Sequence, residues 1–138
     1  MKPVVIYATK TNHSKKLAEA IGAALTVKAA NIADAPALPD TDLLFVVGGI
    51  YGGKDMPELL DYVRNMDMPS LRRAALITSC ASGKQRQDGV RRILEEKGVQ
   101  VMDEFVCRGG ILFVAATHPN AADLKAAADF ARKIAGQR

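Results

Sequence analysis

The stretch PVVIYATKTNHSKKLAEAIGAAL, residues 3–25, decides the fold of this chain. It opens with an apolar, largely β-branched run, Val4–Ala8, which has the length of a buried strand. A polar segment follows, after which apolar residues recur with the spacing of one buried helix face, at Leu17, Ile21, Ala24 and Leu25. The stretch therefore predicts a strand, a hydroxyl-rich loop and a helix that begins in that loop.

The loop between this strand and helix, residues 9–14, is suited to binding an anion. The first N–H groups of a helix have no partner within it, and the helix dipole adds positive potential there. Hydroxyl donors and positive charge can come from the loop side chains Thr9, Lys10, Thr11, His13 and Ser14. The same residues also fit an ordinary capped helix, with Asn12 or Ser14 as the N-cap residue.

Length and composition favour one globular domain. The chain has 138 residues, of which 49% are hydrophobic and 25% charged, so we expect a single domain over residues 1–138. No apolar stretch approaches the roughly 20 residues of a membrane span, and the N-terminal sequence lacks a signal-peptide pattern. Cys80 and Cys107 form neither a disulfide framework nor a metal-ligand spacing. These features predict a cytoplasmic protein with no membrane association.

The net charge of +4 comes partly from a basic cluster around Lys84, Arg86, Arg91 and Arg92. No aromatic residues interleave with these side chains, and only 5% of the chain is aromatic, so a nucleic-acid surface is not indicated. A solvated helix face is the favoured interpretation of the arginines. A docking patch for an acidic partner stays open as an alternative.

Further apolar segments predict the other strands. Residues 26–32 form a weak, alternating segment expected at a sheet edge, whereas residues 43–47 and 74–77 are continuous and typical of strands buried on both faces. Residues 99–105 alternate as in a strand with one exposed face. Another apolar segment, residues 111–115, could extend that strand or pack on the sheet as a loop.

Three more helices are expected. Pro57 suits the first turn of one helix, and Gly98 suits the end of another that contains residues 90–94. Asn120 is a good N-cap for the last helix, with Asp123 three positions on. The alternation of strands and helices predicts an α/β fold, a doubly wound, five-stranded parallel sheet with helices on both faces.

Three loops of this predicted sheet point to a ligand site. They are residues 9–14, 48–53 and 79–83, called here the first, second and third loops. With the strand order 2-1-3-4-5 they follow strands 1, 3 and 4, which are neighbours, at the edge where such sheets bind ligands. The first loop suits a phosphate, and the glycines of the other two allow the backbone to approach a flat ring closely.

With these loops the chain resembles the flavodoxin family, in particular its short single-domain members, over nearly its whole length. Thr9, Thr11 and Ser14 match the family's hydroxyl-x-Thr-Gly-x-Thr/Ser phosphate loop. Asn12 stands where the family usually has glycine, and asparagine tolerates the left-handed conformation better than other non-glycine residues. The third loop lacks the aromatic residue that stacks on the flavin in many members, and their usual net negative charge is also missing.

The resemblance implies an FMN-binding electron-transfer protein that acts with a redox partner protein, as a monomer or weak homodimer. For Tyr51 it implies stacking on the flavin ring, whereas the residues alone also fit an exposed turn tyrosine. The cofactor-binding residues that the resemblance implies are Thr9, Lys10, Thr11, Asn12, His13, Ser14, Gly49, Ile50, Tyr51, Gly52, Gly53, Ser79, Cys80, Ala81, Ser82 and Gly83.

Two other functions stay open at this point. Cys80 and Arg86 form a Cys-x-x-Gly-x-x-Arg pattern between a strand and a helix, which resembles the phosphate-binding loop of cysteine-dependent phosphatases. There the thiolate would attack phosphorus and the guanidinium would hold two phosphate oxygens. A general acid would also be needed, and spacing identifies none. The other possibility is a flavin-free binding or regulatory domain on the same fold.

Overall fold

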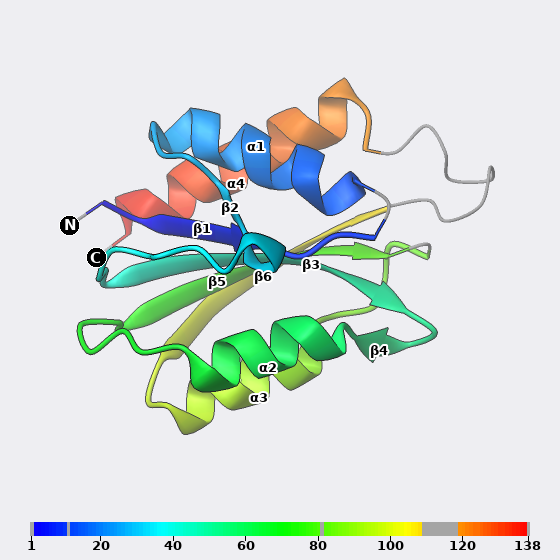
Figure 1. Cartoon of the computed structure of the whole chain (residues 1–138). Helices are drawn as coiled ribbons and strands as arrows, with labels where there is room; N and C mark the ends of the chain where they lie inside the picture. Colours follow the sequence, from blue (N-terminus) through cyan, green and yellow to red (C-terminus); the bar gives the residue numbers. More distant parts are fainter. Residues whose placement is uncertain (1, 11, 81, 109–118, 138) are drawn as a thin grey trace.

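The computed structural model describes residues 2–10, 12–80, 82–108 and 119–137 of the chain. Strands and helices alternate along these residues (Figure 1). The elements are β1 (Val4–Tyr7), α1 (His13–Leu25), β2 (Ala30–Asn31), the 3-10 helix η1 (Ile32–Asp34), β3 (Leu43–Tyr51), β4 (Lys54–Asp55), α2 (Pro57–Asn65), β5 (Arg73–Cys80), α3 (Asp88–Glu96), β6 (Gln100–Arg108) and α4 (Ala121–Gly136).

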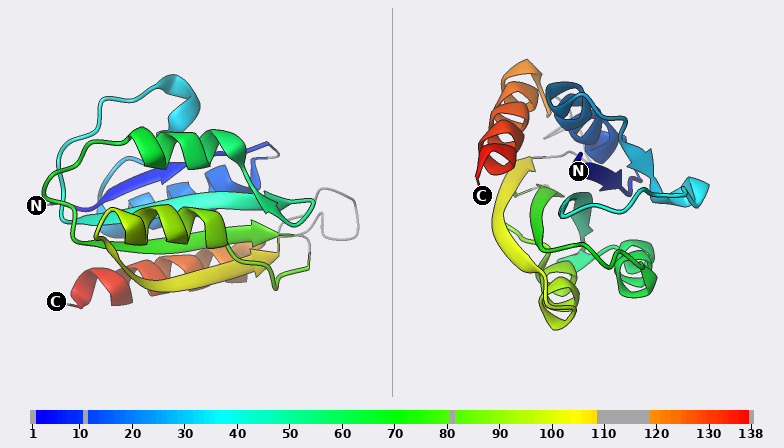
Figure 2. Two further views of the ribbon diagram at one scale, coloured as in Figure 1. Left: turned by 90° about the horizontal axis from the view of Figure 1, so that it is seen from below. Right: turned by 90° about the vertical axis from the view of Figure 1, so that its left-hand side faces the viewer.

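The sheet confirms the predicted strand order. Its parallel strands lie in the order β2-β1-β3-β5-β6, and the short β4 pairs antiparallel with the end of β3. Helices α1 and α4 cover one face and α2 and α3 the other (Figures 1 and 2). The parallel direction brings the carboxyl ends of β1, β3 and β5 to one end of the molecule, opposite the chain termini (Figure 1).

Alternation along the strands divides the core between the two faces of the sheet. In β1, Val4 and Ile6 join the apolar cluster that includes Leu59 of α2, whereas Val5 packs in the cluster that includes Leu17 of α1. Successive strand side chains point to opposite faces, so a continuous apolar run supplies both clusters at once. This explains why the β-branched segment at the start of the chain forms a central strand.

Strands β3 and β5 are longer than predicted, which corrects the extent of the second and third loops. Their pairing runs in register from Leu43 and Arg73 to Ile50 and Cys80. Gly48 therefore lies within a strand, where a Cβ atom would come within 2.5 Å of Leu59 Cδ2. The glycine signal in this segment reflects close packing as well as a turn. Only Gly52 and Gly53, with φ of 61° and 77°, make the turn between β3 and β4.

The segment 26–32 is not the seven-residue strand that was predicted, because only Ala30–Asn31 pairs with β1. The residues before it complete the end of α1: Thr26 is left-handed and the Val27 N–H donates to the Gly22 carbonyl. The Asn31 side chain then caps η1.

Expectations for the helices are confirmed in the described residues. Pro57 occupies the first turn of α2, and Asn120 and Asp123 cap α4 reciprocally with hydrogen bonds of 2.9 Å. Gly98, with φ of 82°, follows the end of α3 as expected. The alternatives for residues 111–115 lie outside the described residues.

Candidate functional site

The first loop makes a tight turn from β1 into α1. The Asn12 backbone N–H donates to Thr9 Oγ1 at 2.8 Å, and Asn12 adopts the left-handed conformation with φ of 66°. Asn12 occupies the N-cap position, but its side chain makes no capping hydrogen bond. The turn therefore comes from the Asn12 backbone conformation and the Thr9 hydroxyl, and it leaves the N-terminus of α1 without a side-chain cap.

Ser14 carries the clearest sign of a ligand in this loop. The residue is 1% exposed, and its Oγ is buried with no hydrogen-bond partner among the described residues. A buried polar group without a partner costs about 1–3 kcal/mol, so such groups are rare in folded proteins. Because Ser14 lies in the first turn of α1, its hydroxyl would gain a partner from an anion bound at the helix N-terminus.

Positive charge at the first loop comes from lysine, not from histidine. Burial, and then the nearby charge of Lys16, lower the pKa of His13 from its ordinary value of 6.5. The imidazole is therefore mainly neutral at pH 7, which does not favour the expectation that a protonated His13 attracts the anion. Lys10, a basic residue, is exposed in this loop.

The second loop meets the first through Tyr51. The Lys10 Nζ atom lies 5.0 Å from the centroid of the Tyr51 ring, within the range of a cation–π contact. The same ring folds over Gly49, where a Cβ atom would approach its Cε2 and hydroxyl oxygen to 2.7 and 2.8 Å. Glycine at position 49 thus gives an aromatic ring access to the backbone at the carboxyl end of β3.

The third loop closes back on the end of β5. The Gly83 N–H donates to the Cys80 carbonyl at 3.2 Å, and the Gln85 N–H donates to Cys80 Sγ at 3.3 Å. Gly83 has φ of 73°, so glycine is needed for this turn. Gln85 also lies beside the second loop, since a Cβ atom at Gly53 would be 3.6 Å from its Nε2.

A buried polar network holds the segment after the third loop against the sheet. Glu104 Oε2 of β6 accepts from Thr78 Oγ1 at 2.5 Å and from the Gln87 backbone N–H at 2.7 Å. Its Oε1 accepts from Arg91 at 3.2 Å, and the Glu104 side chain is fully buried. Gln87 Nε2 donates to the Ile77 carbonyl at 3.0 Å. The network fixes where the chain leaves the candidate site.

Sequence reasoning missed these network residues, Thr78, Gln87 and Glu104. A glutamate in an alternating strand normally faces water. A glutamine just before a helix is normally exposed to solvent as well, or caps the helix. Their burial depends on the meeting of β5, β6 and α3, which no local pattern reveals.

A family model described as a flavodoxin domain matches residues 4–116, most of the chain. The chain belongs to the flavodoxin family. No curated protein sequence matches it significantly.

Solved structures share the flavodoxin fold at low sequence identity. A flavodoxin from the domain Archaea has a TM-score of 0.77 and 18% identity, covering 98% of this chain and 96% of its own. Oxidised flavodoxin 2 from Bacillus cereus has a TM-score of 0.67 and 16% identity, covering 98% of both chains. Rubredoxin oxygen:oxidoreductase from Desulfovibrio gigas has a TM-score of 0.72 and 16% identity over 98% of this chain and 35% of its own.

The structure brings most of the predicted flavodoxin site residues to one end of the sheet. Contacts join the first loop to the second and the second to the third, and Gly49 and Ser79 are direct neighbours across β3 and β5. Gly49, Ile50, Tyr51, Ser79 and Cys80 belong to strands and not to loops. Thr11 and Ala81 lie outside the described residues.

The phosphatase alternative gains no support from this geometry. Cys80 is 1% exposed, and its Sγ contacts Ser82 Oγ and the Gln85 backbone in the segment that follows it. Arg86 is exposed to solvent. A nucleophilic thiol must be reachable by the phosphate ester, with the guanidinium beside it, and these side chains do not meet that requirement.

The described helices of this flavodoxin domain include none with the length and apolarity to cross a bilayer.

Proposed function

We propose that this chain binds FMN at the three loops and transfers electrons to or from a redox partner protein. Membership of the flavodoxin family supports a flavin. The observation that supports a phosphate-bearing one is the buried Ser14 hydroxyl at the start of α1, which has no hydrogen-bond partner among the described residues. The flavin supplies the electron chemistry, while the protein binds it and sets the charge around it.

The first loop would hold the phosphate. Ser14 Oγ gains a hydrogen-bond partner, the backbone N–H groups at the uncapped start of α1 face the anion, and Lys10 adds charge nearby. Asn12 supplies the left-handed turn that this arrangement needs. These groups would favour a phosphorylated flavin over riboflavin.

The second and third loops would hold the ring. Tyr51 lies on the Gly49 backbone in this structure, so the space beside Gly49 accepts an aromatic ring. Gly53 and Gly83 are turn residues of the two loops and both have positive φ. Polar backbone groups close to a flavin shift its reduction potential, which is the means by which this site would adjust electron transfer.

Replacing Ser14 tests the phosphate assignment. We expect Ser14→Ala to weaken FMN binding at least about tenfold, since a hydrogen bond to a charged group contributes about 1.5–3 kcal/mol. Fluorescence titration would give the dissociation constants for FMN and for riboflavin, which lacks the phosphate. Ser70→Ala, at the opposite end of the sheet, is the matched control. Unchanged FMN affinity in Ser14→Ala, or an equal loss for riboflavin, would contradict this assignment.

A further inference from the structure

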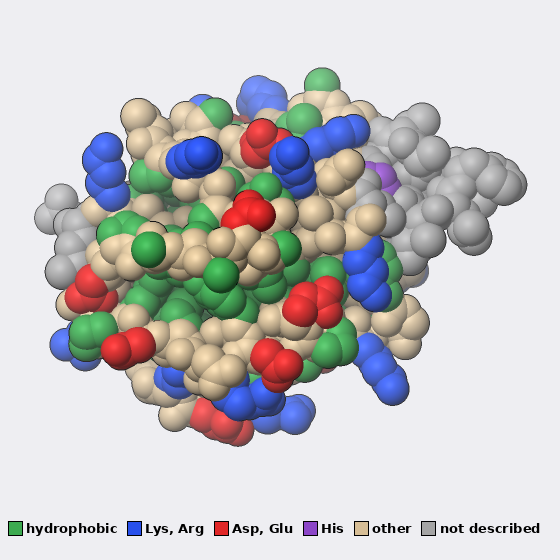
Figure 3. Space-filling view, viewed as in Figure 1, with side chains coloured by type: hydrophobic (Ala, Val, Ile, Leu, Met, Phe, Trp, Pro, Cys, Tyr) green, Lys and Arg blue, Asp and Glu red, His purple; other side chains and the backbone are tan. Residues whose placement is uncertain are grey.

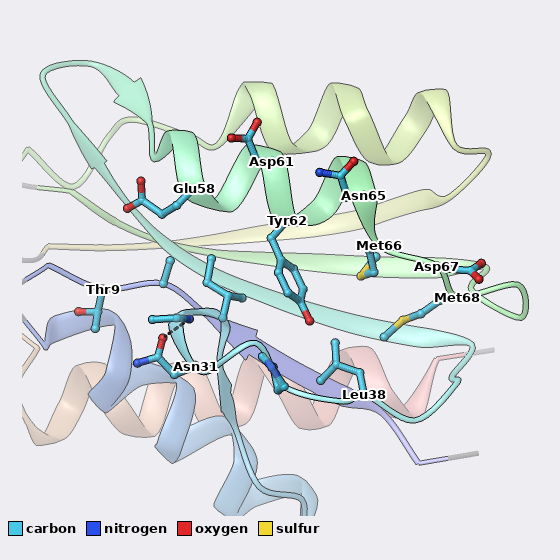
Figure 4. A pocket seen from close by; sticks show the side chains of 14 residues that line it. Thr9, Asn31, Leu38, Glu58, Asp61, Tyr62, Asn65, Met66, Asp67 and Met68 are labelled. Atoms are coloured by element: carbon cyan, nitrogen blue, oxygen red, sulfur yellow. Dashed lines mark hydrogen bonds between the residues drawn. The ribbon is translucent and has the colours of Figure 1, made fainter.

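A groove beside α2 arises because one crossover lacks a full helix. The connections through α1, α2 and α3 carry helices of 13, 9 and 9 residues, whereas the connection from β2 to β3 carries the three-residue η1 and an extended segment with Pro36 and Pro39. The extended segment crosses the same face as α2 without filling it. A groove of about 560 Å³ remains between the two (Figure 4).

The interior of this groove is apolar. Tyr62 extends from α2 across the groove toward Leu38, and Met66 and Met68 lie at the same end (Figure 4). All four are partly buried and pack against the core cluster below. Burial raises the pKa of Tyr62, in keeping with these apolar surroundings. Unbranched methionines adapt to ligands of irregular shape, and the tyrosine offers a ring face.

The rim of the groove is acidic. Its charged lining residues are Glu58, Asp61 and Asp67, all acidic and exposed in a chain whose net charge is +4. Asp61 pairs with Arg64 at 3.1 Å on the surface. Within the described part of the chain, Glu58 and Asp67 form no ion pair. Figure 3 shows apolar side chains in a hollow on this face, with acidic side chains along its margins.

The volume is that of a small-molecule site. Binding pockets for small ligands measure roughly 300–1,000 Å³ and combine an apolar lining with a few polar groups. An anion would be repelled by the rim, and a metal ion would need several converging oxygen ligands, whereas these carboxylates are spread along α2 and the loop after it.

We propose that this groove binds a small organic cation with a flat apolar body, such as an aryl amidine or aryl amine. The apolar body lies against Tyr62, Leu38 and the two methionines, and the cationic group faces Asp67 at the same end of the groove, with Glu58 adding negative charge at the other end (Figure 4). The groove touches the first loop at Thr9, but its acidic side chains belong to α2 and the following loop. The groove therefore shares Thr9 with the proposed flavin site, but the residues that carry this proposal lie outside that site, so the proposal does not rest on flavin binding.

A matched pair of probes tests this inference. The chain labelled with ¹⁵N is titrated with 2-naphthamidine, which is cationic at pH 7, and with 2-naphthamide, its neutral isostere, while amide shifts are followed by NMR. We expect the amidine to bind at least about fivefold more tightly than the amide, because the exposed carboxylates of the acidic rim favour the cation electrostatically. The shifts should concentrate in residues 31–38 and 58–68.

Variants connect the result to the named carboxylates. The double variant Glu58→Gln/Asp67→Asn should lose the preference for the amidine, whereas Glu95→Gln/Glu96→Gln, with two exposed carboxylates on α3, should keep it. These positions are exposed, and an unchanged melting temperature would confirm that each variant is folded. Equal affinity for the two probes, shifts outside the groove, or an unchanged preference in the Glu58/Asp67 variant would overturn the proposal.

Discussion

Asn12 shows how one residue can preserve a loop whose usual sequence is changed. The flavodoxin phosphate loop commonly has glycine at this position, and the structure keeps the left-handed turn with an asparagine at φ of 66°. Sequence reasoning predicted this outcome, because asparagine tolerates left-handed φ better than other side chains. It could not predict that the Asn12 side chain would leave the helix uncapped, since an asparagine before a helix normally caps it.

Substitutions at Asn12 separate backbone conformation from side-chain chemistry. We expect Asn12→Gly to keep the full free energy of unfolding, whereas Asn12→Ala should lower it by about 1 kcal/mol, because a Cβ without a compensating polar group is strained in this conformation. Urea unfolding of the two variants and the wild type would measure this. Equal stability of the alanine and glycine variants would show that the left-handed turn does not constrain the loop.

His13 predicts a dependence of stability on pH. Its pKa is lowered in the folded chain, by burial and then by Lys16, so between that pKa and 6.5 the unfolded chain binds more protons than the folded chain. Stability contributed by the neutral imidazole is present above pH 6.5 and decreases as the pH falls through that value.

The variant His13→Gln should remove this part of the pH dependence. Urea unfolding at about pH 7.5 and about pH 5.5 would give the difference in free energy for the variant and for the wild type. A pH dependence in His13→Gln as steep as that of the wild type would contradict the lowered pKa of His13.

At the scale of the element, strands β3 and β5 show that apolar sequence patterns predict the existence of a strand but not where it ends. The apolar runs of residues 43–47 and 74–77 predicted central strands, and both are confirmed. Their carboxyl ends were predicted as loops, because glycine and hydroxyl residues are typical of turns. The strands continue because each pairs with its neighbour as far as Ile50 and Cys80, and such pairing is a tertiary interaction.

The network around Glu104 should stabilise the segment that leaves the third loop. We expect Glu104→Ala to lower the free energy of unfolding by about 2–3 kcal/mol, because Thr78 Oγ1 and the Gln87 N–H lose a buried acceptor. Hydrogen exchange at the Gln87 amide should accelerate more than exchange at core amides of β5. Glu96→Ala, which removes an exposed carboxylate, is the control. A loss of stability no larger than that of the control would show that the network contributes little.

At the scale of the whole molecule, the sequence predicted the architecture because the alternation of strands and helices is strong and the rules for crossovers are restrictive. With the strand order 2-1-3-4-5, the division of helices between the two faces follows from these rules, and the structure has both. The short crossover after β2 was predicted as a loop with two prolines, but its consequence, a groove beside α2, required the structure. Local sequence patterns predict that this crossover lacks a full helix, but they do not predict the size or lining of the groove that the missing helix leaves.

The candidate flavin site was also predicted only in part from the sequence. The three segments that meet at the carboxyl ends of β1, β3 and β5 were identified from composition and spacing. The approach of Lys10 to Tyr51 depends on a distance between segments that are far apart in the sequence, and the lack of a partner for the Ser14 hydroxyl among the described residues is likewise visible only in the structure. These two observations turn a resemblance between sequences into a physical proposal for a bound flavin.

The central claim is that this chain binds FMN, and a visible absorption spectrum tests it most directly. The purified protein is mixed with excess FMN, freed of unbound flavin by gel filtration, and its spectrum is recorded. We predict that the flavin band elutes with the protein, close to one flavin per chain, with its maxima shifted from those of free FMN. A protein fraction without the flavin band would contradict the account and would favour a flavin-free binding domain on the same fold.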